Sequence, residues 1–292
     1  MSPDAHADVP AELHRSDAVG LVLARPARML GHEPFFGELI GGIESVLATE
    51  DRSLLLHVVP DHAAEIAAYR RWAAGSMVDA VVVVNVVDDD PRLPVLSSLG
   101  LPAVVVGGPR GGMEFTNVWI DDEQAMRDAV AYLVGLGHSS LARVSGPVSL
   151  LHTRARTAGF TAQCDALAVR GISVEGDYTE EAGKHAVRSL LGRRDAPTAI
   201  IFDNDVMALA ALGVAQEMGI AVPGRLSLLA WDDSALCRLA SPPLSAMALD
   251  VHGMGQQVGT CVLTTLAGGP PRPHQAPTPR LSARASTSPH HP

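Results

Sequence analysis

The sequence has little of the chemistry that cysteine, lysine and aromatic side chains supply. Aromatic residues make up 4% of the 292 residues, and the three cysteines, Cys164, Cys237 and Cys261, include no Cys-x-x-Cys pair. Neither a disulfide framework nor a zinc knuckle is therefore indicated. Lys184 is the one lysine, so a Schiff-base mechanism has one candidate, and the phosphate loop that ends in Lys-Ser/Thr is absent.

Long apolar runs and an excess of positive charge are also missing. No stretch approaches the roughly 20 apolar residues that span a membrane, and residues 1–17 lack the apolar segment of a secretory signal. We therefore expect a cytoplasmic protein without a membrane partner. The net charge of −10 disfavours a surface that follows nucleic-acid phosphates, because such binding depends on Lys and Arg.

Motifs of common enzymes are absent as well. The sequence contains no Gly-x-Ser-x-Gly elbow and no His-Glu-x-x-His pair, and its twelve histidines are scattered. His138 follows Gly137 at a predicted helix end, where an imidazole can satisfy the last carbonyls, whereas His152 precedes Arg154 and could reach a cleft. We expect no enzyme, no cofactor and no metal site.

Buried-type strands alternate with amphipathic helices along most of the chain. Strands are predicted at 18–24, 54–59, 78–85, 103–106, around 118, at 141–145, near 178, around 200, around 231 and at 281–287. Helices are predicted in the stretch after Pro34, at 61–75, 93–99, 122–135, 153–170 (with Gly171 as its stop), 182–191 and 254–266, and between the strands around 200 and 231. Nearly continuous apolar strands indicate parallel sheets covered on both faces. The number of βα units predicts an α/β fold of two lobes.

Small polar residues follow two of these strands. Asp203, Asn204 and Asp205 come after one strand, and Asp232 and Asp233 come after the next. Ligands of open parallel sheets bind outside the carboxyl ends of the strands, so these side chains are expected to face one crevice. Helix capping is the alternative for Asp203 and Asp205, whereas ligand contact is favoured for Asn204 and Asp232.

The order of motifs resembles the effector-binding region of LacI/GalR-type transcription regulators over residues 17–287. The residues that carry the resemblance are VGLVLA, PFFGELIGGIE, MVDAVVV, LPAVVV, DAVAYLVGLGHSSLARVSGP, RARTAGF, PTAIIFDNDVMALAAL, VPGRLSLLAWDD, SPPLSA and LSARAST. The resemblance implies a type I periplasmic-binding-protein fold, in which two Rossmann-like lobes joined by three crossovers close over a small ligand. The implied segments are a disordered leader at 1–17, a first lobe at 18–120 plus 251–268, a second lobe at 121–250 plus 271–288, and a disordered tail at 289–292.

Six ligand-binding residues follow from the matching positions. The resemblance implies that Asn85 and Arg156 make polar contacts, that Tyr178 forms an aromatic wall, that Asn204 and Asp232 bind hydroxyls, and that Phe36 lies at the mouth. A sugar or nucleoside needs such acceptors, amides, a guanidinium fork and an aromatic platform. The alternatives are a core role for Phe36, a turn role for Asn85 and a solvated helix face for Arg156.

Two positions depart from the family pattern. Gly107 stands where many relatives have a polar residue, and Leu249 stands where a glutamine is common, so we expect a less polar pocket. Leu249 would pack against the ligand or seal a crossover.

The resemblance also implies a helix-turn-helix ahead of the sensor, and the given sequence has no such segment before Asp17. A natural loss, a late start and a fragment remain open. We therefore expect operator DNA to be bound only through a region outside this chain. The predicted function is an effector-sensing, homodimeric regulator domain for a sugar, polyol or nucleoside, and the alternative is a stand-alone sugar receptor.

Overall fold

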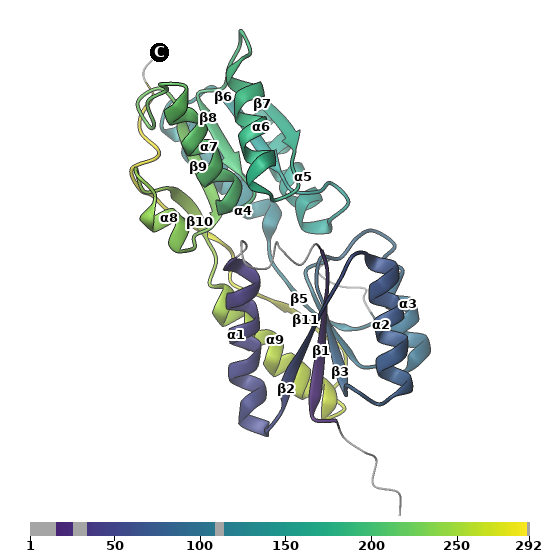
Figure 1. The fold of residues 1–292 in the computed structure, drawn as a ribbon. Coiled ribbons are helices and arrows are strands. Elements are labelled where there is room, and N and C mark those ends of the chain that lie inside the picture. The colour runs from purple at the N-terminus through teal and green to yellow at the C-terminus, as the bar shows by residue number, and fades with distance from the viewer. Residues whose placement is uncertain (1–15, 26–33, 109–113, 291–292) are drawn as a thin grey trace, which may run out of the picture.

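The computed structural model describes residues 16–25, 34–108 and 114–290, which form two lobes (Figure 1). The strands are β1 (Ala18–Ala24), β2 (Ser53–Val59), β3 (Ala80–Val83), β4 (Ala103–Val106), β5 (Thr116–Trp119), β6 (Ser140–Ser145), β7 (Arg170–Glu175), β8 (Ala199–Phe202), β9 (Ser227–Asp232), β10 (Ser245–Ala248), β11 (Pro273–Gln275) and β12 (Arg280–Ser282). The helices are α1 (Pro34–Leu47), the 3-10 turn η2 (Ala48–Glu50), α2 (His62–Ala74), α3 (Arg92–Leu99), α4 (Asp122–Gly135), α5 (Leu151–Ala166), α6 (Glu180–Leu191), α7 (Asp205–Glu217), α8 (Ala235–Leu239) and α9 (Val251–Leu266).

The sheet of the first lobe is parallel and has the strand order β11-β5-β4-β3-β1-β2. Its central strands β3 and β4 have the same sequence, AVVV, and are buried along their whole length, because helices cover both faces. Helices α1 and α9 pack closely on one face. A Cβ at Gly42 would lie 2.1 Å from the carbonyl oxygen of His252, so only glycine permits this approach.

The sheet of the second lobe has the order β12-β10-β9-β8-β6-β7 and is parallel except for the pair of β10 with β12. Helices α6 and α7 contribute to the core on one face, and α4 and α5 to the core on the other. The predicted architecture of two α/β lobes with mostly parallel sheets is therefore confirmed.

The chain passes between the lobes three times. The passages lie between β5 and α4, between β10 and α9, and between β11 and β12. The assignment of residues 271–288 to the second lobe is wrong at its start, because β11 pairs with β5 in the first sheet. Proline is acceptable there, since β11 is an edge strand and needs fewer backbone donors.

Several predicted boundaries are also wrong. Helix α5 ends at Ala166, and Gly171 lies within β7 instead of stopping the helix. A Cβ at Gly171 would lie 2.8 Å from Sγ of Cys164, so this glycine lets β7 approach α5. Strand β7 ends at Glu175, before Tyr178.

Of the two ends predicted to be disordered, residues 1–15 and 291–292 lie outside the described residues. Ser16 is ordered, since its backbone N–H and its hydroxyl donate to Asp79 at 2.9 and 2.8 Å. Near the other end, the backbone N–H of His290 donates to the carbonyl of Leu136 at 2.7 Å. The disorder predicted for these two segments is therefore wrong at residues 16 and 290.

Candidate functional site

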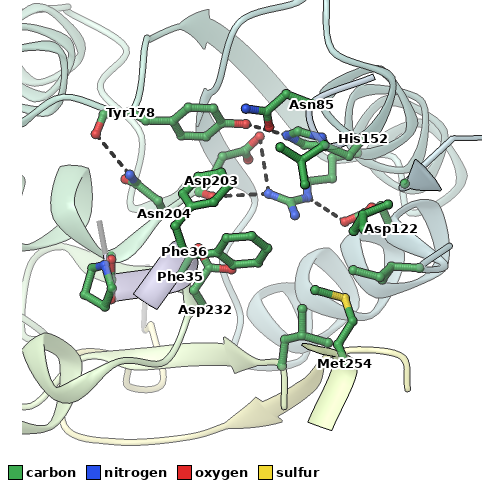
Figure 2. Close-up of a pocket in the computed structure, with 18 of the residues that line it drawn as sticks. Phe35, Phe36, Asn85, Asp122, His152, Tyr178, Asp203, Asn204, Asp232 and Met254 are labelled. Atoms are coloured by element: carbon green, nitrogen blue, oxygen red, sulfur yellow. Dashed lines mark hydrogen bonds and ion pairs between the residues drawn. The ribbon is translucent and has the colours of Figure 1, made fainter. Parts of the chain in front are cut away.

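A cavity lies between the lobes at the carboxyl ends of both parallel sheets (Figure 2). Its empty space, counted out to the mouth and including open solvent, is about 830 Å³. All six sequence-predicted site residues line it. The described lining residues are Arg25, Pro34, Phe35, Phe36, Val84, Asn85, Val106, Gly107, Ile120, Asp122, His152, Arg156, Tyr178, Asp203, Asn204, Asp205, Asp232, Leu249 and Met254.

Arg156 is held rigidly at the floor of this cavity. Its Nε donates to Asp122 at 2.7 Å, and its Nη1 donates to the backbone carbonyl of Asp203 at 3.2 Å. The guanidinium also stacks on the Trp231 ring, 4.3 Å from the ring centroid. Burial by itself lowers the pKa of a guanidinium, but the charges of Asp122 and Asp203 outweigh burial and raise the Arg156 pKa. The side chain is a fixed cation, and the solvated-helix alternative is wrong.

Asp232 ends β9 and is half-buried in the cavity. Its carboxylate has no hydrogen bond or ion pair among the residues that the structure describes. Burial raises its pKa to about 7, and the charges of Asp205, Asp122 and Asp203 reinforce this shift against the opposing charge of Arg156. A half-buried acceptor without a partner among the described residues is an arrangement that a ligand hydroxyl can complete.

The phenol of Tyr178 is fixed by two side chains of α5. Its hydroxyl lies 2.8 Å from Nε2 of His152 (Figure 2). It also lies 3.2 Å from Oγ1 of Thr153. Burial raises the Tyr178 pKa and lowers the His152 pKa to about 3, so both groups are neutral near pH 7. Gly146 makes room for the ring, since a Cβ there would lie 2.0 Å from Cζ of Tyr178.

Asn204 has a structural role as well as a place in the cavity wall. It is the N-cap of α7, where its Oδ1 accepts from the N–H of Met207 at 2.9 Å, and its Nδ2 donates to the carbonyl of Tyr178 at 3.0 Å. Of the alternatives left open for Asp203 and Asp205, the N-cap of α7 falls to neither, because Asn204 holds that position. Asp203 instead accepts from Nε of the buried Arg143 at 2.8 Å.

The first lobe contributes Phe36 and Asn85 of the predicted set. Phe36 is 5% exposed and belongs to the core, yet it also lines the cavity, so its two proposed roles coexist. The guanidinium carbon of Arg25 lies 4.1 Å from the Phe36 ring centroid. Burial lowers the Arg25 pKa to about 10, which leaves it charged at neutral pH.

Three of the six residues have left-handed backbone conformations. The φ angles are 53° at Asn85, 69° at Tyr178 and 81° at Asp232. Such angles are unfavourable for residues other than glycine, and they concentrate at ligand sites, where surrounding structure holds them. Their presence at these strand ends supports a functional reason for the side-chain positions.

Several cavity residues were not singled out from the sequence. Asp122 begins α4 in an Asp-Asp-Glu run typical of a helix start, which hid its contact with Arg156. Arg25 follows β1 without any distinguishing pattern. His152, which sequence reasoning left open, does line the cavity, as do the two departures from the family pattern, Gly107 and Leu249.

His138 lies outside the cavity and satisfies side chains instead of helix carbonyls. Its Nδ1 and Nε2 lie 2.9 Å from Oγ1 of Thr198 and 3.0 Å from Oγ of Ser227, and its ring stacks on His290. Burial lowers its pKa to about 4, with a smaller contribution from His290. The structural role expected for His138 holds, but its partners differ.

Loops of the two lobes also touch beside the cavity. The N–H of Leu151 donates to the carbonyl of Val86 at 2.9 Å, and Nη1 of Arg154 lies 2.5 Å from a carboxylate oxygen of Asp88. These contacts join the segment after β3 to the start of α5. They would break if the lobes moved apart at this side.

Comparison with known proteins gives a consistent result. A family model for a periplasmic binding protein-like domain matches residues 130–287. The HTH-type transcriptional regulator reg1 of Streptomyces lividans is 31% identical over 295 residues, which cover 96% of this chain and 84% of reg1. The solved structure of a LacI family transcriptional regulator from Bifidobacterium animalis has a TM-score of 0.87 and 32% identity, covering 95% of this chain and 100% of that one. A complex of the transcriptional regulator CelR with cellobiose has a TM-score of 0.86 and 26% identity, covering 93% of this chain and 85% of that one.

Proposed function

Because the chain belongs to the LacI-type transcriptional regulators, as an effector-binding domain with the periplasmic-binding-protein-like fold, we propose that its interlobe cavity binds a small polyhydroxylated ligand. The family predicted from the sequence is confirmed. The observation that carries the proposal is the carboxylate of Asp232, which has no hydrogen-bond partner in the described part of the chain and lies near the fixed guanidinium of Arg156. The ligand is of the sugar, polyol or nucleoside class.

The cavity matches the chemistry of vicinal hydroxyls. Asp232 accepts hydrogen bonds, Arg156 donates them in a fixed direction, and the amide of Asn85 can do both. Tyr178 supplies a flat apolar surface against which a ring can lie. The CelR relative was solved with cellobiose, which supports a sugar as the first class to test.

Signalling then depends on how the two lobes are placed. The ligand would contact Asp232 and Arg156 on one lobe and Asn85 and Phe36 on the other, so its binding favours the closed arrangement. We propose that the domain acts as a homodimer in the cytoplasm, and that lobe closure changes the spacing of the two amino ends. Operator DNA would be contacted through a helix-turn-helix outside this chain.

Binding without catalysis fits this account better than an enzyme does. The curated relative and the structural relatives named above are regulators. Apart from this argument, residues 16–25, 34–108 and 114–290 include no helix with the length and apolar character of a membrane span. Nothing in the cavity favours the stand-alone receptor over the regulator.

A thermal-shift screen against sugars, polyols, nucleosides and purines tests the proposal. A ligand at 100 times its Kd stabilises the folded state by about 2.7 kcal/mol, which raises the Tm by several degrees. At least one polyhydroxylated compound should do so. If only purine bases without a sugar stabilise the protein, the ligand class is wrong.

A further inference from the structure

The polar and apolar residues of the cavity are divided between the lobes. The described residues of the second lobe that line it, from Asp122 to Asp232, all carry polar side chains. The first lobe and the crossovers contribute mainly apolar ones, namely Pro34, Phe35, Phe36, Val84, Val106, Ile120, Leu249 and Met254. Figure 2 shows Phe35, Phe36 and Met254 on one side of Asp203 and Tyr178 and His152 on the other, with Asp232 beside Phe35.

A plain sugar fits this division poorly. A hexose carries hydroxyls around its whole ring, and a hydroxyl that loses water against an apolar wall gains no hydrogen bond in return. On the first-lobe side the described polar side chains are Asn85 and Arg25, and the Arg25 guanidinium stacks on Phe36. Gly107 and Leu249 add no polar atom, and Leu249 is 8% exposed.

We propose that the effector carries an apolar substituent, aromatic or alkyl, on its polyhydroxylated ring, as an aryl or alkyl glycoside does. The hydroxylated part lies against Asp232 and Arg156, and the apolar part lies against Phe35 and Ile120. This inference rests on the proposed function, because it assigns a ligand class to the same cavity.

The accessible part of the apolar wall is formed by Pro34, Phe35 and Ile120, which are half-buried and so retain surface for a ligand to cover. Phe35 meets Phe36 edge to face, with ring centroids 5.2 Å apart, so an aromatic substituent would extend an existing aromatic cluster. A nucleobase suits this wall less well, because its polar edge needs donors and acceptors that these residues lack. An apolar substituent needs none.

Matched ligands test the inference. The free sugar, its methyl glycoside and its phenyl glycoside are titrated into the protein by calorimetry, in glucose, galactose and xylose series. In the series that binds, the phenyl glycoside should bind at least about tenfold more tightly than the methyl glycoside. Binding in which the phenyl compound is equal to or weaker than the methyl one overturns the inference and leaves the proposed function standing. Failure of every sugar in every series overturns the inference, and the proposed function is then decided by the polyols and nucleosides of the thermal-shift screen.

Variants locate the effect on the wall. Ile120→Thr keeps the branch at Cβ but replaces the ethyl group by a hydroxyl. It should reduce the ratio of phenyl-glycoside to methyl-glycoside affinity severalfold. Ile220→Thr is the matched control, since Ile220 packs on the core of the second lobe away from the cavity, and it should keep the ratio of the wild type. Asp232→Asn should weaken both glycosides alike. An unchanged ratio in Ile120→Thr would show that the substituent lies elsewhere and overturn the assignment.

Discussion

The unpartnered carboxylate of Asp232 should destabilise the empty protein at alkaline pH. Its pKa rises from the ordinary 3.8 to about 7, mainly because the folded state buries it. A pKa raised by folding means that the folded state binds the proton more tightly than the unfolded state does. This group's contribution to stability is therefore complete below about pH 4 and is lost as the pH rises to about 7.

The size of the effect follows from the shift. About three pKa units at 1.36 kcal/mol per unit give an upper bound of about 4 kcal/mol. The side chain is only half-buried at the cavity, so solvent reduces the cost, and we expect about 1–3 kcal/mol. Asp232→Asn keeps the shape and removes the charge, so it should be more stable than the wild type by this amount at pH 8 and nearly equal to it near pH 4.5.

Urea unfolding followed by circular dichroism at the two pH values measures this difference, provided the m-value is unchanged. Asp233→Asn is the control, because the carboxylate of Asp233 accepts from Nη1 and Nη2 of Arg284 at 2.6 and 2.8 Å. That variant should lose stability at pH 8. If Asp232→Asn also lost stability at pH 8, the carboxylate would have a partner in solution and the reasoning would be refuted.

Three further predictions concern the surroundings of the cavity. Gly146→Ala should weaken effector binding at least tenfold, because the new methyl group displaces Tyr178. The control Gly213→Ala has open space around its Cβ in α7, so it should keep the affinity and add about 0.5–1 kcal/mol of stability. Equal calorimetric affinities for the two variants would contradict this. Because folding lowers the pKa of His138 to about 4, the wild type should lose up to about 3 kcal/mol of unfolding free energy as the pH falls from 6.5 toward 4. His138→Gln should remove this part of the pH dependence. Urea titrations that give the same pH dependence for both proteins would contradict the prediction. Arg154→Ala removes the exposed interlobe ion pair with Asp88, so it should weaken effector binding by about 0.2–1 kcal/mol at low salt and by less at 1 M salt. A large loss of affinity that does not depend on salt would contradict this assignment.

Periodicity and turn residues predicted most of the fold, because the inner strands β1, β3, β4, β8 and β9 are largely apolar runs. The helix after β6 was extended too far because QCDALAVR continues a helical pattern, and only the contact of Gly171 with Cys164 shows why the strand begins there. Strand β11 could not be predicted, since its three residues include a proline and pair only through tertiary context.

The site was predictable where strand ends and the family resemblance coincided. Asn85, Asn204 and Asp232 each lie at the end of a parallel strand, and the topology alone brings such ends together. The pairing of Arg143 with Asp203 was not predictable, because the two residues are 60 positions apart and the sequence around neither residue indicates a buried ion pair. The division of the cavity into a polar and an apolar half needed the packed structure.

The central claim is that Asp232 receives the hydroxyls of a small effector in the interlobe cavity. The direct test is calorimetric titration of the stabilising compound into the wild type, Asp232→Ala and the control Asp233→Ala, with folding checked by circular dichroism. Each hydrogen bond to the carboxylate contributes on the order of 1.5–3 kcal/mol, so binding should be lost in Asp232→Ala and retained in Asp233→Ala. Unchanged affinity in a folded Asp232→Ala variant would contradict the account.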